Sequence, residues 1–158
     1  MGFADEVRAE VKEALQDVTT VFRYSVQDLV AEVKKEGPSK GPPPAPGRGG
    51  SMPVQLGNLR RSLRSSTSAM PQINPNLSEG ISDGQAEIIL TIAGAELGET
   101  VFLGFTAAYA QRLNYGFTGQ DALGRTYDQS GYHFVENAAA RWEQIVAEND
   151  AKVRGFRS

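Results

Sequence analysis

The feature that most constrains the fold is an unbroken helical pattern of apolar residues at the start of the chain. Between residues 3 and 36, apolar side chains recur every three or four positions, and polar side chains fill the other positions. The apolar positions are Val7, Val11, Leu15, Val18, Phe22, Val26, Leu29 and Val33. At about 1.5 Å per residue the predicted helix is about 50 Å long, which exceeds the width of a small domain. Its apolar seam therefore needs a partner along its whole length, either the chain's own domain or a neighbouring subunit.

The helix is predicted to stop at Gly37-Pro38, where a stretch rich in proline and glycine begins. Ten of the sixteen residues from 37 to 52 are proline or glycine, and no apolar residue before Met52 can anchor them to a core. We therefore expect a linker or an extended arm. Residues 43–46 fit a PxxP motif, but a semi-rigid spacer is favoured over a docking motif. An arm that threads between subunits is a third use.

The sequence divides into a long amphipathic helix (1–36), the arm (37–52) and a core domain (53–158) of the α+β class. In the core domain, Leu56, Leu59 and Leu63 share one face of a short predicted helix, and Asn58 is placed to cap it.

Two β-strands are predicted in the middle of the core domain. The apolar runs 86–93 and 99–105 have strand character, and residues 94–98 have the length and glycines of a hairpin loop. Residues 65–83 are rich in serine, proline, asparagine and glycine, which predicts a loop. We expect a small antiparallel sheet of three or more strands, covered on both faces.

The remainder of the core domain is predicted to be mainly helical. A short helix is expected at 107–114, closed by Gly116, and a polar loop at 117–131. From Tyr132 to about 154–155 the spacing of apolar residues predicts a second amphipathic helix. We expect this C-terminal helix to cover one face of the sheet.

Charge is segregated along the chain. The net charge is −3 overall, with −3 on residues 1–36, +5 on residues 37–67 and −5 on residues 68–158. The basic residues of the middle part are Lys40, Arg48, Arg60, Arg61 and Arg64. Such a chain can pair head-to-tail with copies of itself, or it can present its basic part to a polyanion. A sequence pI near 5.2 is unfavourable for an autonomous DNA-binding protein, and a solvated or salt-bridged basic face remains the simplest interpretation.

The sequence offers little material for chemistry. There is no cysteine, and His133 is the only histidine. The acidic residues form no metal-binding motif, and no serine has a recognisable base beside it. We therefore expect no catalytic, cofactor or metal site, and we interpret the chain as non-enzymatic. No apolar run approaches the roughly 20 residues that span a bilayer, and the acidic N-terminus lacks a signal-peptide core, so synthesis in a cytoplasm is expected.

Three short motifs, in a fixed order, suggest a family. The first consists of Pro53, Gly57, Asn58, Leu59, Arg60 and Ser62; the second of Tyr109, Ala110, Tyr115 and Gly116; the third of Phe134 and the alanines 138–140. Together they resemble the tail-completion proteins (head–tail connector or neck proteins) of long-tailed bacteriophages. The chain departs from the family pattern at Gln55, Leu56 and Asn114, where an acid, a threonine and an acid are usual.

The resemblance implies a structural virion protein of the head–tail junction, made in the cytoplasm of a bacterial host. Such proteins form rings, commonly hexameric, around the DNA channel, and they contact neighbouring neck and tail proteins. The motif residues would serve as scaffold. Arg60, Arg61, Arg64, Lys40 and Arg48 would face either a neighbouring subunit or, without sequence specificity, the packaged DNA. The alternative is a small DNA-binding or assembly-regulating protein of a phage or mobile element.

Overall fold

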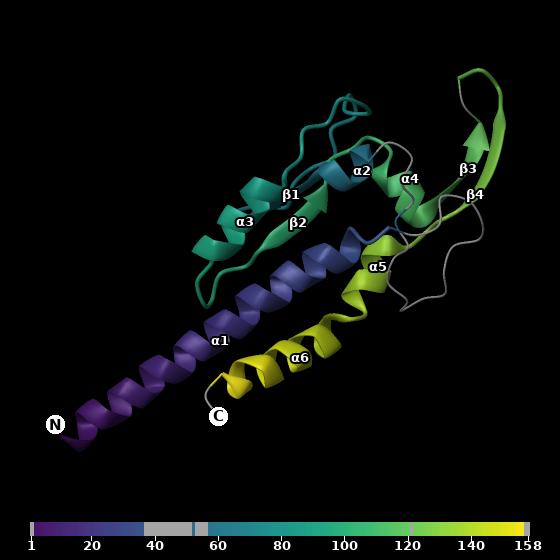
Figure 1. Ribbon diagram of the computed structural model, residues 1–158. Coiled ribbons are helices and arrows are strands. Elements are labelled where there is room, and N and C mark those ends of the chain that lie inside the picture. Colours follow the sequence, from purple (N-terminus) through teal and green to yellow (C-terminus); the bar gives the residue numbers. More distant parts are fainter. Residues whose placement is uncertain (1, 37–51, 53–56, 121, 157–158) are drawn as a thin grey trace.

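The computed structural model describes residues 2–36, 52, 57–120 and 122–156. It has an α+β fold with a long N-terminal helix, two short antiparallel β-ribbons and a helical C-terminus (Figure 1), which confirms the predicted class. The predicted arm lies outside the described residues except for Met52, and Pro53 also lies outside them.

Helix α1 spans Phe3–Val33 and confirms the long helix that the apolar periodicity predicts. Its 31 residues correspond to about 46 Å. The helix ends slightly before the predicted stop because Lys34 forms its C-cap and Glu36 makes a parallel β-bridge with Met52. The Met52 amide donates a hydrogen bond to the Lys35 carbonyl (3.3 Å), and the Met52 side chain is fully buried.

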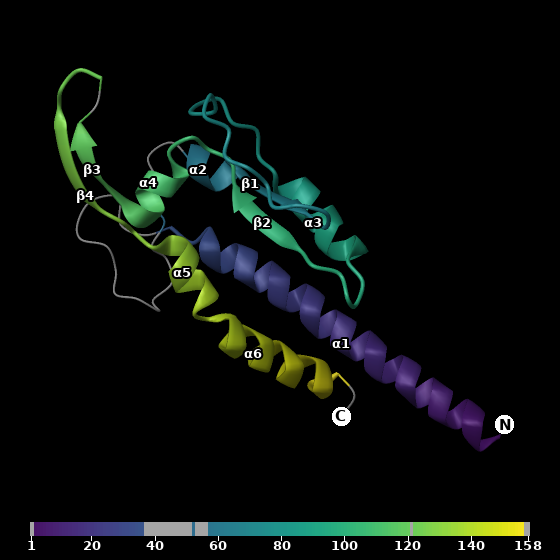
Figure 2. The same ribbon diagram turned by 180° about the vertical axis from the view of Figure 1, so that it is seen from behind.

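The C-terminal helix is broken in two, α5 (Phe134–Ala139) and α6 (Trp142–Gly155). The prediction that it covers the sheet applies in part to α5, whose Phe134 contacts Phe105, and is wrong for α6, which runs alongside α1 (Figure 2). Polar contacts fix this pairing. Arg141 pairs with Glu32 (2.9 Å), and the buried Asn149 donates hydrogen bonds from Nδ2 to Asp28 (2.8 Å) and Ser25 (3.4 Å).

Residues 86–93 are helical, so the strand predicted there is wrong. Helix α3 spans Gln85–Gly94 and lies on the side of α1 away from α6 (Figures 1 and 2). Ile88 and Ile92, four residues apart, are buried, whereas Ile89 and Leu90 are exposed. A short apolar run such as Ile-Ile-Leu-Thr-Ile satisfies both the strand period and the helix period, and packing decides between them.

The first ribbon pairs strands β1 (Leu63–Ser66) and β2 (Phe102–Phe105), with Leu63 opposite Phe105. Strand β2 confirms part of the strand predicted at 99–105. The hairpin predicted at 94–98 is wrong because the partner of β2 is β1, a segment that was expected to be partly helix and partly loop. The sheet is also smaller than expected, since the described residues form two separate two-stranded ribbons.

Helix α2 is a single turn, Asn58–Arg61. The predicted capping role of Asn58 is wrong, because Gly57 occupies the N-cap position and no side chain caps the helix. Gly57 has a φ of 74°, in the left-handed region that glycine adopts without strain.

The second ribbon follows helix α4 (Ala110–Tyr115), which lies where a short helix was predicted. Strands β3 (Gly116–Gln120) and β4 (Thr126–Ser130) form a hairpin that projects from the domain, so the loop predicted at 117–131 is wrong (Figure 1). At its base, a Cβ on Gly131 would collide with the backbone of residues 114–116, so only glycine fits there.

One hydrophobic core joins these elements. It contains the C-terminal half of α1, Met52, and residues of α2, both strands of the first ribbon, α3, α4 and α5. Phe105 and Phe134 meet edge to face at its centre, with ring centroids 5.3 Å apart. The N-terminal half of α1 lies outside this core.

Candidate interaction surfaces

Each of the three motifs that carry the family resemblance contributes at least one residue to the same buried core. Leu59 of α2, Ala110 of α4 and Phe134 of α5 belong to the same buried core, although 75 positions of the sequence separate the first from the last. Tyr109 is half-buried against this core, and its burial raises the pKa of its hydroxyl above 10.0. Gly116 has a φ of 90° where α4 passes into the hairpin. These residues lie in or beside the core, whereas Tyr115 of the second motif is 61% exposed.

Asn114 links the second and third motifs. It is buried, and its Oδ1 accepts a hydrogen bond from the Val135 amide (3.1 Å), while its Nδ2 donates to both carboxylate oxygens of Glu136 (2.9 Å). The Asn114 carbonyl also accepts from the His133 amide (2.9 Å). A carboxylate at this position could accept the amide hydrogen bond but could not donate to Glu136. The departure from the family pattern therefore matches its local partner, which the sequence alone did not indicate.

His133 is placed at the surface. It occupies the N-cap position of α5 with a φ of 51°, and its side chain is half-exposed, 3.8 Å from the Glu136 carboxylate. Within the described residues, no group of three or more His, Asp or Glu side chains is arranged to hold a metal ion.

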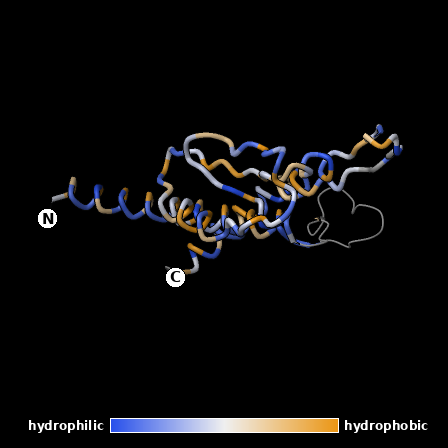
Figure 3. The backbone as a smooth tube through the Cα atoms, turned by 90° about the horizontal axis from the view of Figure 1, so that it is seen from above, coloured by the Kyte–Doolittle hydropathy of each residue, from blue (hydrophilic) through white to orange (hydrophobic). Residues whose placement is uncertain are grey.

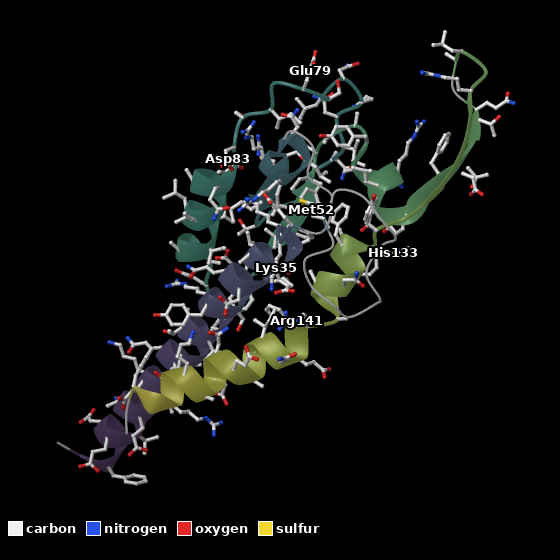
Figure 4. All side chains as sticks on the ribbon, turned by 45° about the vertical axis from the view of Figure 1, so that its right-hand side comes forward. Lys35, Met52, Glu79, Asp83, His133 and Arg141 are labelled. Atoms are coloured by element: carbon white, nitrogen blue, oxygen red, sulfur yellow. The ribbon has the colours of Figure 1, made fainter. Side chains whose placement is uncertain are left out.

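The predicted arginine cluster is part of a larger basic corner where α1 ends. We define the basic corner as Lys34, Lys35, Arg60, Arg61 and Arg64. Lys35 and Arg60 line one shallow cleft together with Gln85 of α3. Figure 4 shows Lys35 at the end of α1 and Asp83 at the head of α3. Lys40 and Arg48 lie outside the described residues. The two lysines were missed, although bases at a helix C-terminus are favoured by the helix dipole.

The three arginines play different roles. Arg64 is structural, because its guanidinium donates to the carbonyls of Arg61 (2.6 Å), Leu63 (3.0 Å) and Ser82 (2.7 Å). A side chain on the neighbouring Gly84 would collide with this guanidinium. Arg60 is exposed and pairs with Glu36 (3.1 Å), and Arg61 is exposed on the same turn. Of the three arginines described at this corner, Arg60 and Arg61 are therefore the ones whose side chains are accessible to a partner.

Lys34 holds the corner to α3. Its side chain is buried and donates from Nζ to Gln85 Oε1 (2.6 Å). Burial lowers the pKa of Lys34 below its ordinary value of 10.5; Asp83 opposes this shift, and Arg60 and Arg64 reinforce it. Lys34 is thus a structural residue whose charge adds to the positive potential of the corner.

After the basic corner, the second candidate surface is the uncovered part of α1, residues 3–18, which we call the overhang. Here α1 extends beyond α6 and the rest of the domain, with apolar residues along its length (Figure 3). Its seam consists of Phe3, Val7, Val11, Leu15 and Val18, which are between 40% and 82% exposed. These residues continue the stripe that is buried further along the helix.

No protein-family model, curated protein or solved structure matches this chain. No helix in the described part of the chain is long and apolar enough to cross a membrane.

The third surface is the outer face of α3. Ala86, Ile89, Leu90 and Ala93 are exposed at helical spacing, and Leu97 follows just after the helix. Leu90 is 73% exposed. We call these five residues the α3 face. An apolar helical face that points away from its own core is typical of an interaction site.

An apolar groove of about 340 Å³ lies between α1, β2, α4 and α5. Leu29, Leu103, Phe105 and Phe134 contribute to its walls, and its polar lining comes from Gln111, Asn114 and Tyr115. Among the described residues, no cluster of titratable groups lines this groove.

Proposed function

We propose that this protein is a structural subunit of the neck of a long-tailed bacteriophage. In this role copies of the chain assemble into a ring around the DNA channel between head and tail. The observation that carries the proposal is the overhang, an apolar seam of about four helical turns that the chain itself leaves uncovered. Exposed apolar stripes of this length are characteristic of subunits that are completed by a neighbour.

The resemblance to neck proteins supports the same role. Its three motifs lie far apart in the sequence, yet they meet around Leu59, Ala110 and Phe134 in one core. A set of residues that specifies a scaffold, with several uncovered surfaces around it, fits an interlocking subunit. The proposal includes no catalytic step.

Electron microscopy of the purified full-length protein tests the proposal. We expect closed rings with a central channel wide enough for duplex DNA. In the phage that encodes the chain, deletion of its gene is expected to leave unjoined heads and tails. Complete, infectious particles from the deletion mutant would refute the proposal. So would a reproducible nuclease or hydrolase activity that disappears in His133→Ala.

The basic corner keeps a second function open, that of a small DNA-binding or assembly-regulating protein. Its exposed bases can contact phosphates without reading sequence. This function requires that the free, unassembled protein binds duplex DNA in a salt-sensitive way. Absence of duplex binding at low salt, together with ring formation, would favour the neck.

A further inference from the structure

Two uncovered apolar surfaces of this chain, the overhang and the α3 face, are both exposed faces of helices. The overhang is a single helix of 16 residues, about 24 Å long, and the α3 face is the outer side of a helix of about 15 Å. An overhang that packs along α3 therefore extends about two turns beyond one end of it. At the N-terminal end of α3 lies the basic corner, which Lys34 joins to Gln85.

The glutamates and the bases beside the overhang seam lie on opposite sides. At about 100° per residue, Glu6 and Glu10 lie on one flank of the line through Val7 and Val11, and Arg8 and Lys12 lie on the other, where Arg8 also pairs with Asp5 (3.5 Å). The acidic flank is complementary to Lys35, Arg60 and Arg61 of the basic corner. The basic flank is complementary to the region of α3, because residues 65–111 contain five acids and no lysine or arginine. Apolar and charged groups thus both match.

The same sorting disfavours pairing of two overhangs with each other. In an antiparallel pair related by a two-fold axis, each flank meets its own copy, so Glu6 and Glu10 would face glutamates and Arg8 and Lys12 would face bases. In a parallel pair the flanks are complementary, but both folded bodies would lie at the same end. There the α1 stripe is already covered by the chain's own core.

We propose that the overhang of one copy docks on the α3 face and basic corner of the next copy. This contact is heterologous, because the two surfaces are different and lie on different parts of the molecule. Repetition of such a contact generates a ring when the rotation closes. The inference rests on the proposed ring, and it specifies which surfaces join neighbouring subunits.

Introduced cysteines test the docking, and the absence of natural cysteine makes each new thiol unique. We expect the double variant Val11→Cys/Leu90→Cys, oxidised as full-length protein, to give a ladder of cross-linked dimers, trimers and larger species. Each single variant is expected to remain un-cross-linked. A mixture of the two single variants is expected to give the dimer only. The matched control is Ala9→Cys/Leu90→Cys, because Ala9 is exposed on the opposite side of α1 and should not cross-link.

Three outcomes would overturn the docking. Val11→Cys alone forming dimers would show that overhangs pair with each other. Rings visible by electron microscopy without a Val11–Leu90 cross-link would refute this interface and leave the neck proposal intact. Absence of both rings and cross-links would refute both. A cross-linked ladder without closed rings would support the docking and count against the ring.

A complementation experiment provides an independent readout. Val11→Asp spoils the overhang and Leu90→Asp spoils the α3 face, so we expect each variant alone to remain monomeric. Mixing them leaves one intact overhang and one intact α3 face, and a one-to-one dimer is expected. A mixture that stays monomeric while the unmodified chain assembles would overturn the proposed pairing.

Discussion

The two halves of α1 carry the same apolar pattern and have opposite environments. In the C-terminal half, Val26, Val30 and Val33 are buried among α3, α5 and the first ribbon. In the N-terminal half, Val7, Val11 and Leu15 are exposed. The spacing of apolar residues is continuous across the boundary, so the pattern identifies a face of the helix without indicating what covers it. One continuous apolar face can therefore be buried in the chain's own core along one half of a helix and left exposed along the other half.

The same charge placed in each half of α1 is expected to give very different losses of stability. Val30 is 2% exposed, so Val30→Asp buries a carboxylate without a partner, and we expect the free energy of unfolding to fall by more than about 5 kcal/mol. Val11→Asp, at a position 52% exposed, should change the stability of the monomer by no more than about 0.5 kcal/mol. Urea denaturation of both variants under dissociating conditions measures this. Equal losses would mean that the overhang is packed within its own chain.

A gentler version of the same test uses α3, which also has a buried and an exposed side. Ile88 is fully buried and Ile88→Ala leaves a cavity, so a loss of about 2–5 kcal/mol is expected. Leu90→Ala should change stability by less than about 0.5 kcal/mol and weaken assembly instead. Thermal unfolding and sedimentation of the pair separate the two effects. A stable monomer of Ile88→Ala would contradict the assignment of this face to the core.

The sequence predicted an element correctly where the spacing of its apolar residues fits a helix but not a strand. The 31 residues of α1 repeat over many turns, so the helix was identified nearly to its ends. The run 86–93 is shorter than three helical turns, and the alternation of Ile88, Leu90 and Ile92 fits a strand equally well. Its helical state depends on α1 and β1, which lie beside it only in the folded chain. The hairpin of β3 and β4 was missed because its residues are polar and carry little strand signal.

The basic corner also contains both kinds of residue, some bonded within the fold and some exposed. Arg64 donates to three carbonyls, so Arg64→Ala is expected to destabilise the fold by about 1–3 kcal/mol. Charge reversal of Lys35, Arg60 and Arg61 together should leave stability almost unchanged and impair assembly, whereas a single reversal has a small effect because exposed pairs contribute at most about 1 kcal/mol each. Chemical denaturation and ring counting in micrographs report the two outcomes. Normal rings that fail to retain DNA would instead assign the corner to the channel.

The smallest expected effect concerns pH and Lys34. Burial lowers the pKa of Lys34 in the folded state below 10.5. Between that pKa and 10.5 the unfolded chain therefore binds more protons at Lys34 than the folded chain does. The contribution of Lys34 to the free energy of unfolding rises with pH over this range. Lys34→Met should remove the rise, which denaturation curves at several pH values below about 10 can detect. Measurements stay below that limit because Tyr109, with its raised pKa, contributes the opposite slope above pH 10.0. An unchanged pH profile in Lys34→Met would contradict the buried placement of this amine.

The site was predictable only in part. Arg60, Arg61 and Arg64 were identified as a cluster because they are close in sequence. Their separate roles depend on Glu36, Ser82 and Gly84, which approach them through the fold. Lys34 and Lys35 join the cluster because α1 ends beside α2, a relation that no local spacing encodes. Asn114 was identified only as a departure from a pattern, and its partner Glu136 became evident from the hydrogen bonds.

The polar contacts between α1 and α6 also define a length. These contacts fix where α6 lies along α1, because Asn149 is bonded to Asp28 and Ser25 and Arg141 is paired with Glu32. They therefore also fix the point along α1 at which α6 no longer covers it. Beyond this point the overhang protrudes by about 24 Å, so a rotation of about 10° at its base moves its N-terminal tip by about 4 Å. In the proposed docking, the length of the overhang would therefore set the spacing between the folded bodies of adjoining copies. Seven residues inserted in the overhang would lengthen it by about 10 Å and would rotate its apolar face by no more than about 20°.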